Sequence, residues 1–312
     1  MKRQYTYIVT LFLTVLLILF IFYNRYNATY QEEKITSFIS KNIDILNENM
    51  DFEKEYALSL SLFLSKDKKI KDALLKNNQK KALEEIKFFL NDIKRATKID
   101  NIDIQIHTKE LKAFARSWEN GGYLGLELSG FRRGLVRVKK SLKPFVSTEL
   151  GKRLNIKAIS PVLDKNGTFL GSVEIIINFK NIKDRLKKFN LDMLVLLDKK
   201  FINIAVDLKN NKQIGNYYLT QKEYSKELYK ILTKNPNILK SKKAYEKVNG
   251  KYIVLIPMLS VGIDDVGIIV LSMDSKISDI STINQESIIE QNFQYKFKKT
   301  KREVIIKWKF FC

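Results

Sequence analysis

The stretch NIKAISPVLDKNGTFLGSVEIII, residues 155–177, decides the fold. Two apolar runs, 155–163 and 168–177, flank the sequence Asp164-Lys165-Asn166-Gly167, and an Asn-Gly pair between apolar runs favours a tight hairpin turn. We therefore predict two antiparallel strands joined by this turn. Upstream, residues 101–107 alternate strictly, with isoleucine at every second position and polar residues between, which is typical of a strand with one buried face.

Helical patterns surround these strands. Apolar residues recur every three or four positions over 32–64 and 80–96, which predicts a long helix followed by a second one. Shorter helices are predicted at 127–142, 179–189, 224–232 and 275–291. Further strands are predicted at 145–150, 192–197, 201–205, 251–259 and 266–273. This order predicts an α+β fold with two tandem modules, each an antiparallel sheet with flanking helices.

Composition excludes several classes of site. The chain has 312 residues and a formal net charge of +22, with one His and a single Cys at its last position. Internal disulfides, Cys-based zinc clusters and multi-His metal sites are therefore excluded. We find no phosphate-binding Gly-rich loop and no nucleophile elbow, so we assign no catalytic residue and no cofactor and expect no enzyme. Basicity alone does not imply a nucleic-acid partner, because Lys, Asn and Ile are all heavily used.

The N-terminal segment predicts a membrane anchor. Residues 5–23 carry no charge and nearly match the thickness of a bilayer core as a helix. A cleaved signal peptide is the alternative, but it requires small residues at the cleavage site, and Phe22-Tyr23-Asn24-Arg25 offers none. Lys2 and Arg3 precede the segment, so the positive-inside rule favours a cytoplasmic N-terminus. We expect a single-pass protein of the cell inner membrane with a periplasmic sensor domain, which argues further against nucleic acid.

Polar residues among the predicted strands suggest a binding site. On a helical wheel of 127–142, Arg132 lies on the flank of the apolar stripe, whereas Arg133 and Arg137 point to the far side. Lys157 and Glu174 each stand in the middle of an apolar strand and need a partner or solvent. One hypothesis is a cleft with an aromatic wall and several cations, suited to a small anionic or zwitterionic ligand. The alternative is structural: Lys157 and Glu174 pair across strands, Trp118 belongs to the core, and His107 is a satisfied strand residue.

Six blocks of sequence stand in a characteristic order, namely Ile104–Lys109, Phe114–Trp118, Leu128–Arg132, Glu149–Gly151, Ile156–Val162 and Leu170–Glu174. Together they resemble the sensor region of bacterial methyl-accepting chemotaxis receptors with a double Cache domain. The resemblance implies tandem Cache (PAS-like) modules and a ligand-binding set of His107, Arg116, Trp118, Arg132, Lys157 and Glu174. Lys157 stands where members of this family usually carry Arg. Such receptors also continue into a second membrane helix and a cytoplasmic hairpin, so we expect this chain to be truncated before them.

Together these observations predict the extracytoplasmic ligand-sensing part of a chemotaxis receptor, acting in signal transduction. The expected parts are a cytoplasmic stub (1–4), a transmembrane helix (5–23), a long helix with a membrane-distal module (30–180), a membrane-proximal module (181–280) and a basic tail (281–312). Alternatives are the sensor of a histidine kinase or diguanylate cyclase, and a tethered periplasmic binding module without signalling output. The expected partners are a small-molecule ligand, the membrane, and a second copy or a related receptor that pairs through the apolar stripe of the long helix.

Overall fold

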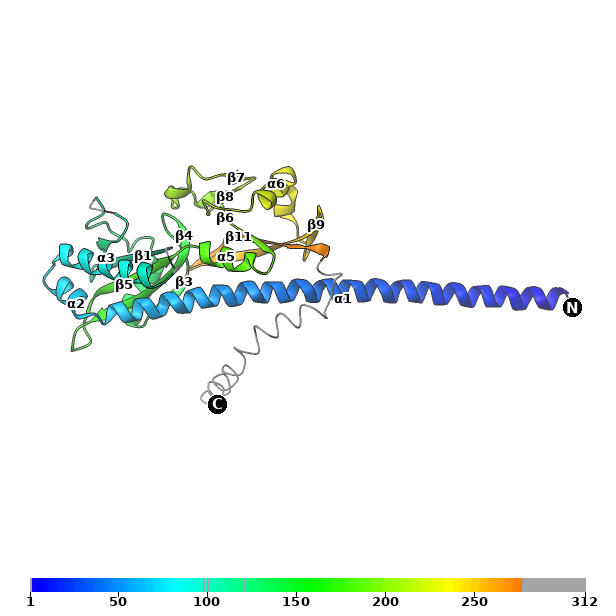
Figure 1. Cartoon of the computed structure of the whole chain (residues 1–312), viewed down its shortest axis with the longest axis horizontal. Coiled ribbons are helices and arrows are strands. Elements are labelled where there is room, and N and C mark those ends of the chain that lie inside the picture. Colours follow the sequence, from blue (N-terminus) through cyan, green and yellow to red (C-terminus); the bar gives the residue numbers. More distant parts are fainter. Residues whose placement is uncertain (1, 98, 100, 120–121, 277–312) are drawn as a thin grey trace. The chain divides into compact units, whose positions relative to one another are not determined.

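The long N-terminal helix is continuous. The computed structural model describes residues 2–97, 99, 101–119 and 122–276. Its first element, α1 (Lys2–Ser65), is a single uninterrupted helix (Figure 1). The large apolar side chains between Leu11 and Tyr23 are exposed on this helix. Within the described part of the chain, α1 is the one helix long and apolar enough to cross a membrane.

Two helices follow, and each begins at a capping side chain. Asp67 accepts a hydrogen bond from Ile70 N at 2.9 Å and starts α2 (Lys68–Leu75). Asn78 accepts one from Lys81 N at 3.0 Å and starts α3 (Gln79–Ala96). Such caps satisfy backbone donors that have no partner within the helix. The prediction of a helix at 80–96 is confirmed, whereas α2 was not predicted.

The first sheet has the strand order β2-β1-β5-β4-β3, and all its neighbouring strands are antiparallel. Its strands are β1 (Ile102–Thr108), β2 (Ala113–Arg116), β3 (Phe145–Leu150), β4 (Leu154–Leu163) and β5 (Phe169–Ile177). The hairpin predicted within 155–177 is confirmed as β4–β5. In its turn, Asp164 Oδ1 accepts hydrogen bonds from Asn166 N and Thr168 N, both at 2.8 Å, while Gly167 adopts a φ of 81°. A positive φ is accessible to glycine without strain.

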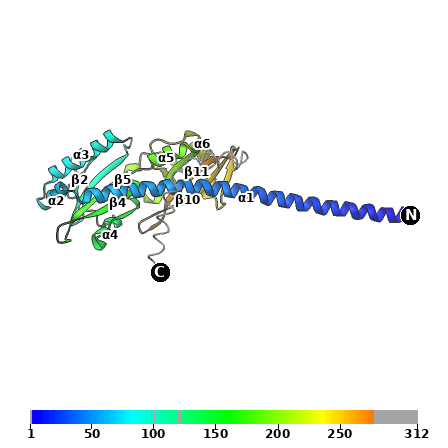
Figure 2. The ribbon, with the colours of Figure 1, turned by 60° about the horizontal axis from the view of Figure 1, so that its bottom comes forward.

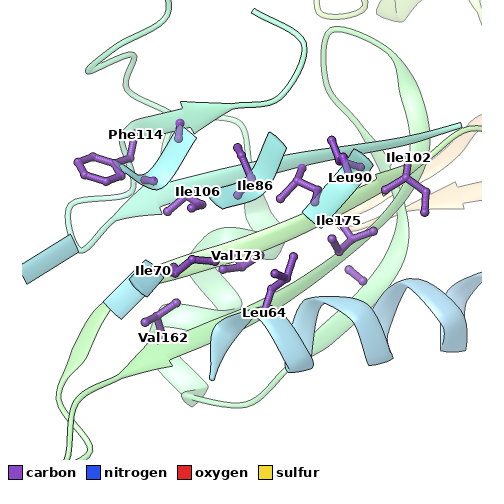
Figure 3. Close-up of a cluster of buried hydrophobic side chains, with 14 of the residues drawn as sticks. Leu64, Ile70, Ile86, Leu90, Ile102, Ile106, Phe114, Val162, Val173 and Ile175 are labelled. Carbon is purple, nitrogen blue, oxygen red and sulfur yellow. The ribbon is translucent and has the colours of Figure 1, made fainter. Parts of the chain in front are cut away.

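One face of this sheet packs against the helices. Figure 3 shows Leu64 of α1, Ile70 of α2 and Ile86 of α3 against isoleucines and valines of β1 and β5. The alternating residues Ile102, Ile104 and Ile106 all belong to this core, as predicted. Full burial of one such side chain contributes about 1.5–3 kcal/mol, so this layer holds the module together. Helix α4 (Arg133–Ser141) covers the opposite face, and Figure 2 shows α3 and α4 on the two sides of the sheet.

Helix α4 begins six residues later than predicted. The segment before it is not helical, because Glu127 forms an antiparallel bridge with Lys112 and Leu128 N donates to Leu111 O at 3.3 Å. These long-range contacts keep residues 127–128 out of the helix. The helix ends at Leu142, which adopts a left-handed conformation with a φ of 53°.

The second sheet has the order β7-β8-β6-β11-β10-β9 and follows helix α5 (Lys180–Lys187). Its elements are β6 (Leu191–Asp198), β7 (Gln213–Ile214), β8 (Tyr217–Leu219), β9 (Glu246–Val248), β10 (Lys251–Ser260) and β11 (Ile263–Asp274), with helix α6 (Lys226–Lys234) and short 3-10 helices η1 (Lys199–Phe201), η2 (Val206–Leu208) and η3 (Pro236–Lys240). Leucines 194, 196, 228 and 232 form its core with Ile253 and Val270. The fold class is confirmed: a long N-terminal helix and two antiparallel sheets with flanking helices.

Three predictions for other elements had different outcomes. The strand predicted at 201–205 is wrong, because Asp198 caps η1 and Ala205 N donates to Phe201 O, which gives a helical turn. Of the helix predicted at 275–291, residues 275 and 276 are described, and the rest lies outside the described residues. The stripe on α1 proposed to pair with a second copy packs partly within the chain, since Leu46, Met50 and Leu64 are buried.

Candidate functional site

The face of the first sheet opposite α1 carries polar side chains in register. Alternation along β1 places Gln105 and His107 on this face, away from the isoleucines. Gln105 pairs with Arg116 on one side and with Glu174 on the other, so these three residues form a row across β2, β1 and β5. On β4, Asn155 and Lys157 lie on the same face by the same alternation. The strands therefore position six polar side chains beneath α4.

Arg132 is buried and held by two carboxylates. It occupies the N-cap position of α4, where its Nε donates to Glu149 Oε1 at 3.2 Å and its Nη2 donates to Glu174 Oε1. Burial disfavours the charged guanidinium, but the charges of Glu174 and Glu149 outweigh it and raise the pKa of Arg132. Glu149 Oε1 also accepts from Gly134 N at 3.3 Å, in the first turn of α4. Arg132 therefore serves a protein ion-pair network, which differs from the free donor predicted for it.

His107 lies behind this network. Its ring is fully buried, with Nδ1 at 3.0 Å from Ser172 Oγ and Nε2 at 3.6 Å from Glu174 Oε2. Burial, reinforced by the charges of Arg132 and Arg116, holds the pKa of His107 well below its usual range. The ring is therefore neutral at physiological pH. Nε2 and Glu174 Oε2 are both buried without a hydrogen-bond partner among the described residues.

Lys157 is a buried cation that no described residue binds directly. Its side chain is 4% exposed, and no described residue forms a hydrogen bond or an ion pair with its Nζ. The cross-strand pair with Glu174 is absent, because Lys157 lies opposite Ile176 while Glu174 lies opposite Ile159 and binds Arg132. Burial, with repulsion from Arg132 added, lowers the pKa of Lys157 to about 8. A Cβ at Gly151 would lie 2.6 Å from Lys157 Nζ, so this glycine leaves room for the ammonium.

Arg116 and Trp118 form an aromatic and cationic wall. The Arg116 guanidinium lies 5.5 Å from the Trp118 ring centroid and 5.0 Å from that of Tyr123, within the range of cation–π attraction. Arg116 Nη1 donates to Glu119 Oε2 at 2.9 Å. Trp118 is half-buried, so it is a wall residue and does not belong to the core.

One cavity brings together four of the six predicted site residues. Arg116, Trp118, Arg132 and Lys157 line a volume of about 60 Å³, whereas His107 and Glu174 lie outside its lining. The lining also includes residues that were not predicted, namely Gln105, Leu126, Leu128, Phe131, Gly151, Lys152, Arg153, Asn155, Ile176 and Asp207. Strand alternation could have identified Gln105 and Asn155, because each lies two residues from a predicted site residue on the same face. The positions of Arg153 and Asp207 depend on the contact between the two modules, for which the sequence carries no local signal.

A larger groove elsewhere is a weaker candidate. It has a volume of about 640 Å³ and lies between α1, β3 and β10. Its charged residues Asp51 and Lys54 pair with each other at 2.9 Å, so they leave no charge for a ligand. The Lys157 cavity, in contrast, contains a buried ammonium that no described residue binds directly. We therefore take the Lys157 cavity as the candidate functional site.

Sensor domains of signalling proteins are similar to this chain in structure. The sensor domain of the V. cholerae histidine kinase DctB is 12% identical, with 76% of this chain and 96% of that chain covered and a TM-score of 0.47. The domain of a putative sensory box/GGDEF family protein from Vibrio parahaemolyticus is 10% identical, covering 80% and 99%, with a TM-score of 0.46. The ligand-binding domain of the Campylobacter jejuni chemoreceptor Tlp3, solved with L-valine, is 13% identical, covering 80% and 97%, with a TM-score of 0.40. TM-scores below 0.5 carry no weight for ligand or output.

The family comparison is decisive. No curated protein matches the sequence. The family model dCache_3, described as the double sensory domain of two-component sensor kinases, matches residues 39–277. This range includes both sheets and every residue of the Lys157 cavity. The chain therefore belongs to the dCache_3 family of double sensory domains.

Proposed function

We propose that the chain senses a small carboxylate-bearing solute outside the cytoplasm, and that the solute binds at Lys157. The observation that carries this proposal is the unpaired, buried ammonium in a cavity with an aromatic wall. Taking a charge out of water without a partner is costly, so a ligand carboxylate would supply the missing counter-charge. Trp118 and Arg116 add a surface on which the rest of a flat or zwitterionic solute can pack.

The cavity must enlarge to hold a whole solute. Its volume of about 60 Å³ is far below the ~300–1,000 Å³ of pockets for drug-sized ligands. Residues 122–132, the segment that precedes α4, contribute Leu126, Leu128 and the half-exposed Phe131 to its lining. Gly122 and Gly125 in the segment adopt φ values of 50° and 74°, where a glycine backbone is unstrained. Ligand entry would move this segment, which makes it the two-state element that a sensor requires.

Calorimetry on a soluble fragment, residues 30–280, tests the site. A thermal-shift screen of amino acids and small organic acids first identifies a ligand. We expect the Lys157→Met variant to lose binding at least tenfold, because it removes the counter-charge of the carboxylate. The control is Lys165→Met in the exposed β4–β5 turn, which should bind like the wild type. Equal affinities of all three proteins would refute the site.

A route for the signal starts beside Lys157. Gly151 packs against the Lys157 ammonium, and both neighbours of Gly151 bind the second module. Leu150 N donates to Ser260 Oγ at 3.0 Å, and Lys152 O accepts from Asp207 N at 3.1 Å. A carboxylate that repositions the ammonium would therefore shift a segment tied to β10 and η2. The ligand would thus make different contacts in two states of the domain, and such a difference couples binding to a change of state.

The proposed topology places the sensor in the periplasm of a single-pass inner-membrane protein. It rests on the exposed apolar side chains of α1 from Leu11 to Tyr23 and on the basic residues before them. In this arrangement residues 30–180 form the membrane-distal module and 181–280 the membrane-proximal one. A periplasm-dependent reporter enzyme fused after residue 280 should be active. If a cytoplasm-dependent reporter fused at the same place were active and the periplasm-dependent one inactive, the topology would be refuted.

Two signalling outputs have support. The family description favours a two-component sensor kinase. The sequence blocks around Trp118, Arg132 and Lys157 favour a methyl-accepting chemotaxis receptor. The DNA downstream of the Cys312 codon distinguishes them. A kinase module there favours the first output, and a methylated coiled-coil hairpin favours the second.

A further inference from the structure

A second, larger cavity lies where the two modules meet. Its volume is about 260 Å³, and it shares Arg153, Asn155 and Asp207 with the Lys157 cavity. Other walls come from α5 and from the segment before α6, including Lys183 and Gln221. The cavity is therefore separate from the Lys157 ammonium but adjacent to its site.

Two side-chain amides line this cavity, and one of them has a buried donor without an acceptor among the described residues. The Asn155 side chain is 6% exposed, and none of the described residues forms a hydrogen bond with its amide. Gln221 Oε1 accepts from Val195 N at 3.0 Å, but Gln221 Nε2 is buried and has no acceptor within the described residues. Buried polar groups in native proteins nearly always have a partner, so the Gln221 donor at this cavity indicates a missing acceptor, and the Asn155 amide is available beside it.

The charges of the lining favour an anion. Arg153, Lys180, Lys183 and Lys222 face two acidic residues, Asp207 and Glu223. The ion pairs between these residues have long nitrogen–oxygen distances. Lys183 Nζ lies 3.4 Å from Glu223 Oε2, and Arg153 Nε lies 3.5 Å from Asp207 Oδ2. Charge-assisted hydrogen bonds are usually 2.7–2.9 Å, so an incoming carboxylate could replace these contacts with shorter ones.

Apolar walls complete the cavity. Phe179 and Leu208 both line it and are 1% and 2% exposed. We propose that this inter-module cavity is a second binding site, for a small organic carboxylate held by Arg153, Lys183 and the amides of Asn155 and Gln221. Because Arg153 and Asn155 also line the Lys157 cavity, occupancy of either site changes the affinity of the other by the same factor.

Fluorine NMR on the full chain in lipid nanodiscs tests this proposal, with trifluoroacetate as the probe. Broadening of the trifluoroacetate signal reports binding at any site. Incorporated 5-fluorotryptophan reports the Lys157 cavity through Trp118, and a Trp308→Phe variant assigns the two tryptophan signals. The two readouts distinguish the second site from the site of the proposed function.

The Lys157→Met variant should keep part of the trifluoroacetate broadening while the Trp118 signal no longer responds. Adding Gln221→Leu or Lys183→Gln to it should reduce the remaining broadening at least fivefold. Loss of all broadening in Lys157→Met alone, or no broadening in the wild type, would overturn the second site. Residual broadening unaffected by both added substitutions would overturn it as well. Each variant's melting transition shows that it is folded before it is compared.

Discussion

Replacing Lys157 with methionine should stabilise the sensor in the absence of ligand. Residue Lys157 is 4% exposed and no described residue pairs with its ammonium, while Glu149 and Glu174 each bind Arg132 through Oε1. Methionine has a similar length and no charge, so it fills the same space without the desolvation penalty. A stabilising substitution at this position would show that Lys157 destabilises the fold, as expected of a residue kept for ligand binding.

The magnitude follows from the pKa of Lys157. Burial lowers it from 10.5 to about 8, a difference of about 2.5 units, and one unit corresponds to about 1.4 kcal/mol. The charged side chain therefore costs the folded state up to about 3 kcal/mol. Below pH 8 both states are protonated and the full cost applies. Between pH 8 and 10.5 the unfolded state binds a proton that the folded state does not, so the stability of the wild type rises with pH.

Thermal unfolding of fragment 30–280, followed through Trp118 fluorescence, measures this effect. For a domain of this size, about 3 kcal/mol corresponds to a rise in Tm of roughly 6–12 °C at pH 7. The advantage of Lys157→Met should shrink steadily as the pH approaches 10.5. Lys165→Met, in the exposed turn, should change Tm little at any pH. A Lys157→Met variant that is less stable than the wild type at pH 7 would refute the reasoning, since the ammonium would then have a partner or ordered water.

The remaining predictions concern the neighbours of Lys157 and the helix surface. Gly151→Ala should weaken ligand binding at least tenfold in calorimetry, because the added methyl group displaces Lys157 Nζ. Gly130→Ala, at a position with no neighbouring atom within 4 Å, should bind normally, and equal affinities of the two variants would contradict this prediction. Arg132→Met should lower the free energy of unfolding in urea by about 3–5 kcal/mol, because two buried carboxylates lose their partner. Arg137→Met, on the exposed face of α4, should lower it little. Similar values for the two variants would show that the ion-pair network does not stabilise the fold. The fragment should self-associate weakly through α1, and Phe63→Glu, at a side chain 69% exposed, should abolish this in sedimentation; a wild type that is strictly monomeric at high concentration argues against it.

Local patterns predicted the longer strands, because a run of six or more residues shows the chemistry of its faces. The β4–β5 hairpin has boundaries within one residue of those expected, since an Asn-Gly turn fixes its register. Strand β2 was missed because four residues are too short to show a period. The start of α4 was misplaced because the Lys112–Glu127 bridge joins segments that no local pattern connects.

Four of the six predicted site residues line the candidate cavity, but the pairing of their charges was not predicted. Mid-strand charge identified Lys157 and Glu174, and the helical wheel identified Arg132. The pairing of these charges depends on three-dimensional contacts. Glu149 of β3 accepts hydrogen bonds from Arg132 and from Gly134 N in the first turn of α4, and no local pattern indicates this. The sequence therefore suggested Arg132 as the free cation, whereas in the described part of the chain Lys157 is the cation without a direct partner in this site.

A crystal structure of fragment 30–280 with a carboxylate solute from the thermal-shift screen tests the central claim most directly. We expect a carboxylate oxygen within hydrogen-bond distance of Lys157 Nζ, the solute against Trp118, and Arg132 still bound to Glu149 and Glu174. A solute bound elsewhere in the first module, with the Lys157 ammonium unpaired and its cavity unchanged, would contradict the account.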